Sequence, residues 1–175
     1  MKKYFKYLLL LIVLFLFGCG KSMTPRSAVD EFFSKYIKLD DAIVDQLNSY
    51  VKAEGLTEEQ EEVYKKVLRR EYTNLEYDIV SEETNGDETI VNVKVKVFDL
   101  YKAQKEAMEY YKNNPKMFKS NDEFMDYKLD KMSTISDKHE YDMALTVVKD
   151  NDGYRVKQLN NSDLEKIHGM YNYEE

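Results

Sequence analysis

The sequence predicts an α+β domain in which N-terminal helices pack on an antiparallel sheet of about four strands. Apolar residues recur at helical spacing up to residue 72, and they alternate with polar ones in two later stretches, near residues 75–97 and 141–159. Each alternating stretch contains a turn signal, as a hairpin requires. Helical spacing returns between the two stretches, so a helical insertion between two hairpins is expected.

Three helices are expected before the first hairpin. Thr24-Pro25 is a helix start, Asp40 or Asp41 can cap a second helix that Gly55 ends, and residues 57–60 form a capping box for a third. The apolar stripes are Val29, Phe32, Phe33, Tyr36 and Ile37, then Ile43, Val44, Leu47, Tyr50 and Val51, then Val63, Tyr64, Val67, Leu68 and Tyr72.

The first hairpin turns at Asn85-Gly86 and returns through four alternating valines, at positions 91 to 97. Lys94 and Lys96 lie between those valines, so one face of this hairpin is expected to be solvated. The inserted helical segment runs from Leu100 to Met132 and is interrupted near Pro115.

The second hairpin is expected to turn at residues 150–153 and to return as a strand from Tyr154 to Leu159. A short final helix is then expected to begin at Ser162.

The first 18 residues have the features of an export signal. Three lysines precede ten unbroken apolar residues, Leu8 to Phe17, and Gly18 stands before Cys19. This run is shorter than the roughly 20 residues that span a bilayer. We therefore expect cleavage of residues 1–18, a short tether at residues 19–24 and a single domain at residues 25–175.

Leu16-Phe17-Gly18-Cys19 resembles the bacterial lipoprotein box, and Cys19 is the only cysteine of the chain. The resemblance implies that Cys19 carries lipid, palmitate included, and becomes the new N-terminus. The protein would then be held at the extracytoplasmic face of the cell membrane, in the cell envelope. An ordinary cleaved signal that happens to contain a cysteine is the alternative.

The charge bears on possible partners. The formal net charge of −7 becomes −10 once the three signal lysines are removed. An acidic domain of this kind is not expected to bind nucleic acid, and contact with the membrane is expected through the lipid on Cys19.

Three segments resemble the nuclear transport factor 2-like (SnoaL-like, cystatin-like cone) fold. They are TPRSAVDEFFSKYIKLD, TIVNVKVKVFDLY and TVVKDNDGYRVKQL. This resemblance implies that the sheet is curved and that the first helices pack on it. The whole chain also resembles small lipoproteins of Firmicutes-type bacteria, through its opening, YKAQKEA and DLEKIHG. That likeness implies location and fold and no particular substrate.

Two histidines are the candidates for chemistry. His139 shares its strand parity with Tyr141, so its ring is expected near the apolar face, where some cone-fold enzymes place a base. A half-solvated histidine at the rim of the sheet is the favoured alternative, which leaves His139 a weak catalytic candidate. His168 is expected at the end of the last helix, where a cation is favoured by about 0.3–1 kcal/mol.

No metal site and no cofactor are expected. His168 has no second histidine or cysteine at ligand spacing. The acidic run at residues 58–62 suits a helix start, and the run at residues 150–153 lacks the later bidentate Glu of a calcium loop. Phosphate-loop, nucleophile-elbow and zinc-helix motifs do not occur in the sequence.

Five tyrosines fall on expected inward faces and could line a partly polar pocket if they converge, although simple core packing explains them too. They are Tyr36, Tyr64, Tyr72, Tyr77 and Tyr141.

These observations favour a membrane-anchored extracytoplasmic lipoprotein with a non-catalytic ligand-binding or protein-interaction domain. The working surface would be either the pocket between sheet and first helix or the inserted helices. One alternative is a cone-fold enzyme that uses His139 with inward tyrosines. Another is a dimeric envelope scaffold without a ligand.

Overall fold

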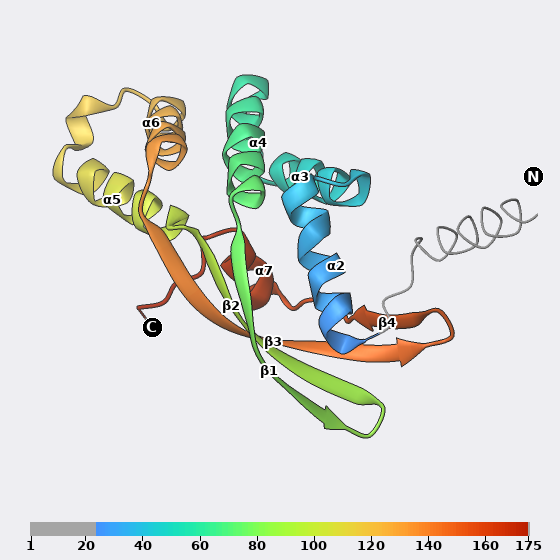
Figure 1. The fold of residues 1–175 in the computed structure, drawn as a ribbon. Helices are drawn as coiled ribbons and strands as arrows, with labels where there is room; N and C mark the ends of the chain where they lie inside the picture. Colours follow the sequence, from blue (N-terminus) through green and yellow to red (C-terminus); the bar gives the residue numbers. More distant parts are fainter. Residues whose placement is uncertain (1–23, 175) are drawn as a thin grey trace, which may run out of the picture.

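The computed structural model describes residues 24–174, which form an α+β fold with a four-stranded antiparallel sheet. The expected lipidation site, Cys19, and the signal peptide lie outside the described residues. Strand order follows chain order, β1-β2-β3-β4. Helices α2, α3 and α4 lie on one side of the sheet, and the α5–α6 hairpin projects beyond one end of it (Figure 1).

The first three helices begin and end at the predicted signals. Helix α2 (Pro25–Lys38) starts from a capping box at Thr24, and α3 (Asp41–Ala53) is capped by Asp40, whose carboxylate accepts from the Ile43 amide at 3.0 Å. Leu39 adopts a left-handed conformation (φ 53°) between them, so two residues suffice to turn the chain.

Helix α4 (Glu58–Thr73) starts from the predicted capping box of Thr57 and Gln60. The Gln60 amide also donates to Asp126 Oδ1 at 2.8 Å, which ties α4 to α6 (Asn121–Thr134). The inserted helices are therefore fastened to the N-terminal group and not only to the sheet.

Strands β1 (Glu76–Asn85) and β2 (Glu88–Phe98) form the first hairpin around Gly86, whose φ is +62°. On β2 the alternating valines are buried, while Lys94 on the other face donates to Glu140 of the neighbouring strand at 2.6 Å. The solvated face predicted for this hairpin is confirmed.

Helix α5 (Leu100–Asn113) follows β2, and a short 3-10 helix (Pro115–Met117) leads into α6. Strand β3 (Lys138–Asp150) then pairs with β2 along its length, with Val91 opposite Leu145 and Val95 opposite Tyr141. These residues pack in the core with the inner faces of α2, α3 and α4 and with buried residues of α5 and α6.

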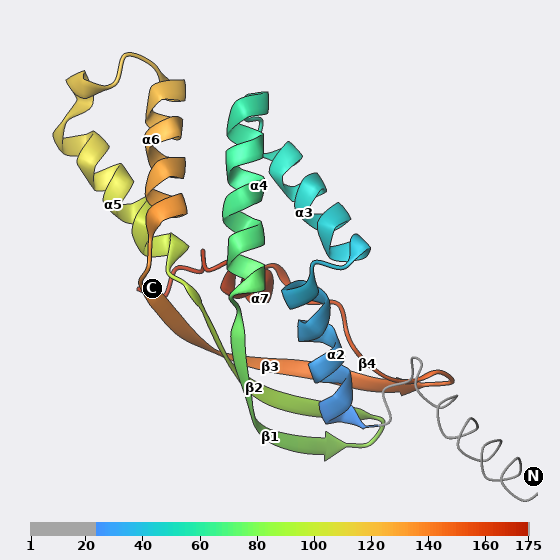
Figure 2. The same ribbon diagram turned by 45° about the horizontal axis from the view of Figure 1, so that its top comes forward.

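The chain after β3 departs from the prediction in two places. Strand β4 covers only Gly153–Val156, because after Lys157 donates its amide to Thr146 the chain leaves the sheet toward α7. Helix α7 (Asn161–Ile167) begins one residue before Ser162, because Asn160 caps it by accepting from the Asp163 amide. Figure 2 shows α7 beside the lower end of α4. Over residues 24–174, no helix is both long and apolar enough to cross a membrane.

Candidate functional site

A half-open cavity of about 550 Å³ lies where α2, α3 and the end of α4 meet the β4–α7 segment. Its size falls within the range of small-molecule sites. We call it the aromatic cavity. It is lined by Phe32, Tyr36, Asp45, Gln46, Ser49, Tyr50, Tyr72, Val156, Lys157, Gln158, Leu159, Leu164 and His168.

Local folding brings these side chains to one place. On α2, Phe32 and Tyr36 are four residues apart and so share one helix face, and their rings lie 5.3 Å apart. Helix α3 lines the next wall, beginning at Asp45. The early end of β4 leaves residues 157–159 outside the sheet, and together with Val156 they form part of the cavity wall.

Three polar rings in this wall are almost completely buried. Tyr36 is 4% exposed, Tyr72 2% and His168 7%. They are adjacent to one another, since the ring centres of Tyr36 and Tyr72 are 5.2 Å apart and those of Tyr72 and His168 5.8 Å apart. Buried polar groups in proteins normally have a hydrogen-bond partner, either another protein group or an ordered water molecule.

These three rings have no such partner within residues 24–174: none of the hydroxyls of Tyr36 and Tyr72 or the imidazole of His168 hydrogen-bonds to another described residue. Their polar atoms keep some solvent contact, because Glu71 Oε2 is the only fully enclosed, unpartnered side-chain oxygen or nitrogen in the described chain. The three groups therefore present unused hydrogen-bonding capacity to the cavity.

Burial also decides the charge of these groups. It raises the pKa of Tyr36 to about 12 and also raises that of Tyr72. It lowers the pKa of His168 from 6.5 to about 4, so the imidazole is neutral at pH 7. The expected cationic role of His168 at the helix end is wrong, because its ring is buried against Tyr50 and Tyr72.

The remaining charges of the cavity are unbalanced. Lys157 is the one cation among the lining residues, and its ammonium already donates to Glu88 Oε1. Asp45 is exposed at the lining and forms no ion pair with a described residue. Burial raises the pKa of Tyr50, and the carboxylates of Glu54 and Glu165 raise it further. Among the lining residues, Asp45 is therefore the one charge without an ion pair to a described residue.

The five predicted pocket tyrosines do not converge on this cavity. Tyr36 and Tyr72 line it, whereas Tyr64 lines a separate cavity of about 240 Å³ and donates to Met170 Sδ. The hydroxyl of Tyr77 donates to Asp30 and that of Tyr141 to the Tyr171 carbonyl. Their positions on inward faces are correct, but three of the five belong to other contacts.

His139 does not line the aromatic cavity. It lies opposite Val97 near the start of β3, half-buried, and its ring stacks on Tyr173 at 3.9 Å. This agrees with the alternative favoured from the sequence, a half-solvated histidine at the rim of the sheet. The C-terminal segment covers the ring there, and Tyr173 itself donates to Asp99 at 2.8 Å.

Sequence reasoning placed Tyr50 and His168 outside the pocket set. The spacing of Tyr50 on the apolar stripe of its helix gave the same signal as that of Tyr36. No sequence signal distinguishes a buried His168 from an exposed one, because its burial depends on contacts of its ring with Tyr50 of α3 and Tyr72 of α4.

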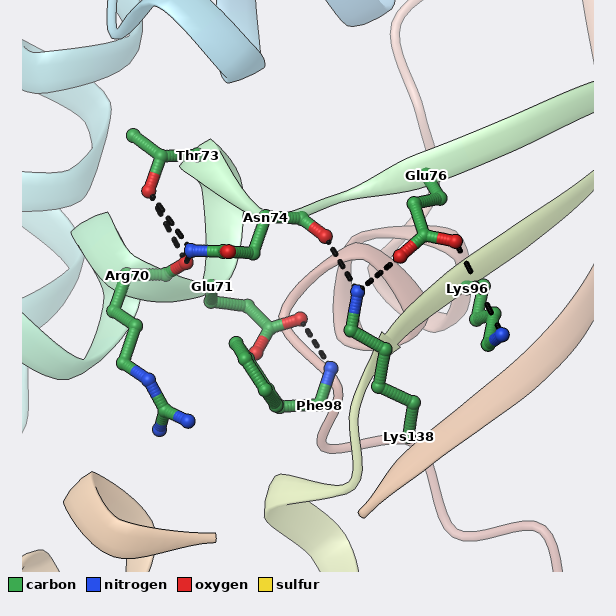
Figure 3. A network of polar contacts seen from close by, with 8 residues as sticks. All are labelled: Arg70, Glu71, Thr73, Asn74, Glu76, Lys96, Phe98 and Lys138. Carbon is green, nitrogen blue, oxygen red and sulfur yellow. Dashed lines mark hydrogen bonds and ion pairs between the residues drawn. The ribbon is translucent and has the colours of Figure 1, made fainter. Parts of the chain in front are cut away.

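A second buried polar group lies directly behind the cavity wall. Glu71, 1% exposed, precedes Tyr72 on α4 and accepts a hydrogen bond from the Phe98 amide at 3.0 Å (Figure 3). Burial raises its pKa well above the ordinary value. Next to it, Gly169 (φ +68°) packs so closely that an added Cβ would lie 2.2 Å from the Phe98 carbonyl oxygen. We call Glu71, Phe98 and Gly169 the Glu71 cluster.

Side chains around the Glu71 cluster hold the same junction from outside. The Arg70 guanidinium lies 3.8 Å over the Phe98 ring and donates to the carbonyls of Ser133 and Ile135 at the end of α6. Lys138 donates to the Asn74 carbonyl and to Glu76 (Figure 3). The cluster thus joins the ends of α4, β2, α6 and α7, which is a structural role.

Among residues 24–174, no group of three or more His, Cys, Asp or Glu side chains is arranged to hold a metal ion. Comparison with protein-family models, with curated proteins and with solved structures finds no match for this chain.

Proposed function

We propose that this protein is a lipid-anchored extracytoplasmic lipoprotein whose domain binds a small ligand in the aromatic cavity. The observation that carries ligand binding is the group of three buried polar rings without protein partners. Their polar atoms reach solvent only at the cavity, so water or a ligand there has to supply their hydrogen bonds. A ligand with complementary polar groups can replace this water.

The anchoring part of the proposal is supported by the Leu16 to Cys19 box and the short signal before it. Cys19→Ala is expected to leave an unprocessed precursor that takes up no labelled palmitate. Normal processing and labelling of this variant would contradict the anchor. Ser22→Ala, three residues beyond Cys19, is the matched control and should be processed and labelled as wild type.

Ligand binding is tested by native mass spectrometry of the full-length processed protein, released gently from non-ionic detergent. A retained small mass that is lost in a Tyr36→Phe, Tyr72→Phe double variant supports the cavity as the site. A retained mass that survives this change would place the ligand elsewhere. A protein without any bound mass, which also binds nothing in a fragment screen, would contradict the proposal.

A second candidate function, self-association as an envelope scaffold, rests on the tip of the α5–α6 hairpin. Met117 is 64% exposed there, beside a group of packed aromatic rings that includes Tyr110, Phe118 and Tyr127. Sedimentation velocity across micromolar concentrations tests it. A dimer that Met117→Asp dissociates would favour the scaffold, and a monomer throughout would exclude it.

The catalytic alternative gains nothing from the geometry. The ring of His139 stacks on Tyr173, and His139 does not line the aromatic cavity. A substrate bound in that cavity would therefore not contact His139. The proposed function is therefore binding without catalysis.

A further inference from the structure

The aromatic cavity has a chemical preference that can be deduced from three of its features. They are the unused acceptors on its wall, the sign of its charges and its aromatic surface. This inference rests on the proposed function and specifies the class of ligand.

The first feature is the set of acceptors. A tyrosine hydroxyl accepts hydrogen bonds, and a neutral imidazole has one acceptor nitrogen. Tyr36, Tyr72 and His168 therefore offer three acceptors, all without a partner in the described chain and all on adjacent rings. A primary ammonium has three N–H donors, which match this set in number. Each of the three groups can also donate one hydrogen bond, so the choice between a cation and an anion rests on charge.

The second feature is charge. A carboxylate or phosphate ligand would need a cation, and the lining Lys157 is already paired with Glu88. Asp45, the lining charge that has no ion pair with a described residue, favours a positive ligand instead. His168 carries no charge at pH 7, so it does not repel a cation.

The third feature is the aromatic surface. Phe32, Tyr36, Tyr50 and Tyr72 all line the cavity. Aromatic faces attract cations and also cover the apolar body of a ligand. A volume of about 550 Å³ leaves room for such a body in addition to the charged group.

We propose that the aromatic cavity binds a primary organic ammonium ion with an apolar or aromatic body. Its ammonium group donates to Tyr36, Tyr72 and His168, and its body lies against the rings of Phe32 and Tyr50.

Four probes of nearly the same shape test this proposal by calorimetry on the full-length processed protein in non-ionic detergent. Phenethylammonium has the charge and the N–H donors. 2-Phenylethanol lacks the charge, phenylacetate reverses it, and phenethyltrimethylammonium keeps it without N–H donors. Phenethylammonium is expected to bind at least fivefold more tightly than each of the other three.

Protein variants sharpen the test. Tyr36→Phe and Tyr72→Phe should each weaken phenethylammonium at least threefold and should leave 2-phenylethanol within twofold. Tyr77→Phe is the control, because its hydroxyl donates to Asp30 at 2.9 Å and its ring does not line the cavity. It should bind phenethylammonium as wild type does.

Equal or tighter binding of 2-phenylethanol or phenylacetate would overturn the ammonium class while leaving ligand binding in the cavity intact. Equal binding of the trimethyl probe would overturn the role of the three acceptors. If none of the four probes binds, the inference is wrong, and the retained mass in native spectrometry decides separately on the proposed function.

Discussion

The Glu71 cluster and the aromatic cavity both contain buried polar side chains, and they are built from neighbouring residues. Glu71 and Tyr72 are consecutive on α4, and His168 and Gly169 are consecutive at the end of α7. In the cluster, Glu71 accepts a hydrogen bond from a backbone amide of β2. In the cavity, Tyr72 and His168 have no protein partner among residues 24–174.

The difference teaches how to separate a structural polar group from a binding one. A structural polar group such as Glu71 joins elements that are distant in the chain, so its replacement should destabilise the fold. A binding group such as Tyr72 has no protein partner for its hydroxyl, so its replacement should weaken ligand binding more than it destabilises the fold. Four predictions test this separation, beginning with the largest expected effect.

Gly169→Ala should destabilise the protein by roughly 3 kcal/mol or more, because a Cβ at φ +68° would clash with the Phe98 carbonyl. Urea unfolding measures this. Gly55→Ala is the matched control, since Gly55 also has φ +68° and has nothing within 4 Å of the added Cβ. It should lose only about 1–2 kcal/mol from the left-handed backbone. Equal losses would mean that the close approach at Gly169 does not matter.

His168 should make the protein less stable as the pH falls. The unfolded chain takes up a proton at this imidazole below about pH 6.5, whereas the folded chain resists it until about pH 4. Between pH 7 and pH 5 this favours unfolding by about 2 kcal/mol. Unfolding of His168→Phe should lack that part of the decline. His139→Phe should retain it, and an undiminished decline in His168→Phe would contradict the burial of His168.

Glu71 should have the opposite pH dependence. Its pKa is raised in the folded chain, so above about pH 4.5 unfolding releases a proton and stability decreases as the pH rises through the folded value. Glu71→Gln cannot ionise and can still accept from the Phe98 amide. Its unfolding free energy should therefore increase relative to wild type between pH 5 and pH 8. A constant difference across that range would show that Glu71 ionises normally.

The smallest effects distinguish tyrosines with and without partners. Tyr36→Phe and Tyr72→Phe should change stability by less than about 0.5 kcal/mol, because their hydroxyls have no bond to lose. Tyr77→Phe and Tyr141→Phe remove bonds to Asp30 and to the Tyr171 carbonyl and should each cost about 1 kcal/mol. Thermal unfolding at one pH compares the four variants. Equal losses in all four would remove the distinction between cavity and core.

Much of the fold could be predicted because its signals are local. The capping boxes at Thr24 and Thr57, the turn at Gly86 and the valine alternation of β2 each appear in the structure where the sequence indicates them. Predictions failed at the end of β4, where the departure of the chain from the sheet after Lys157 is not a local property.

The candidate site could be predicted only in part. Tyr36 and Tyr72 were found because periodicity shows which face of a helix is inward. Periodicity does not show whether the hydroxyl of an inward tyrosine has a hydrogen-bond partner in the protein. Tyr64, Tyr77 and Tyr141 were therefore predicted as pocket residues too, although the structure gives each of them such a partner.

By itself the sequence determined the α+β class, the order of the helices and strands and the inward faces of each, since periods of 3.6 and 2 and capping residues act within a few positions. Only the tertiary structure decided that the His168 ring packs against Tyr50 of α3 and Tyr72 of α4, where it is buried and neutral. It also decided that Glu71 has a partner while Tyr72 has none among residues 24–174. These properties depend on distances between residues far apart in the chain. Packing of the whole core sets those distances, and no local pattern encodes them.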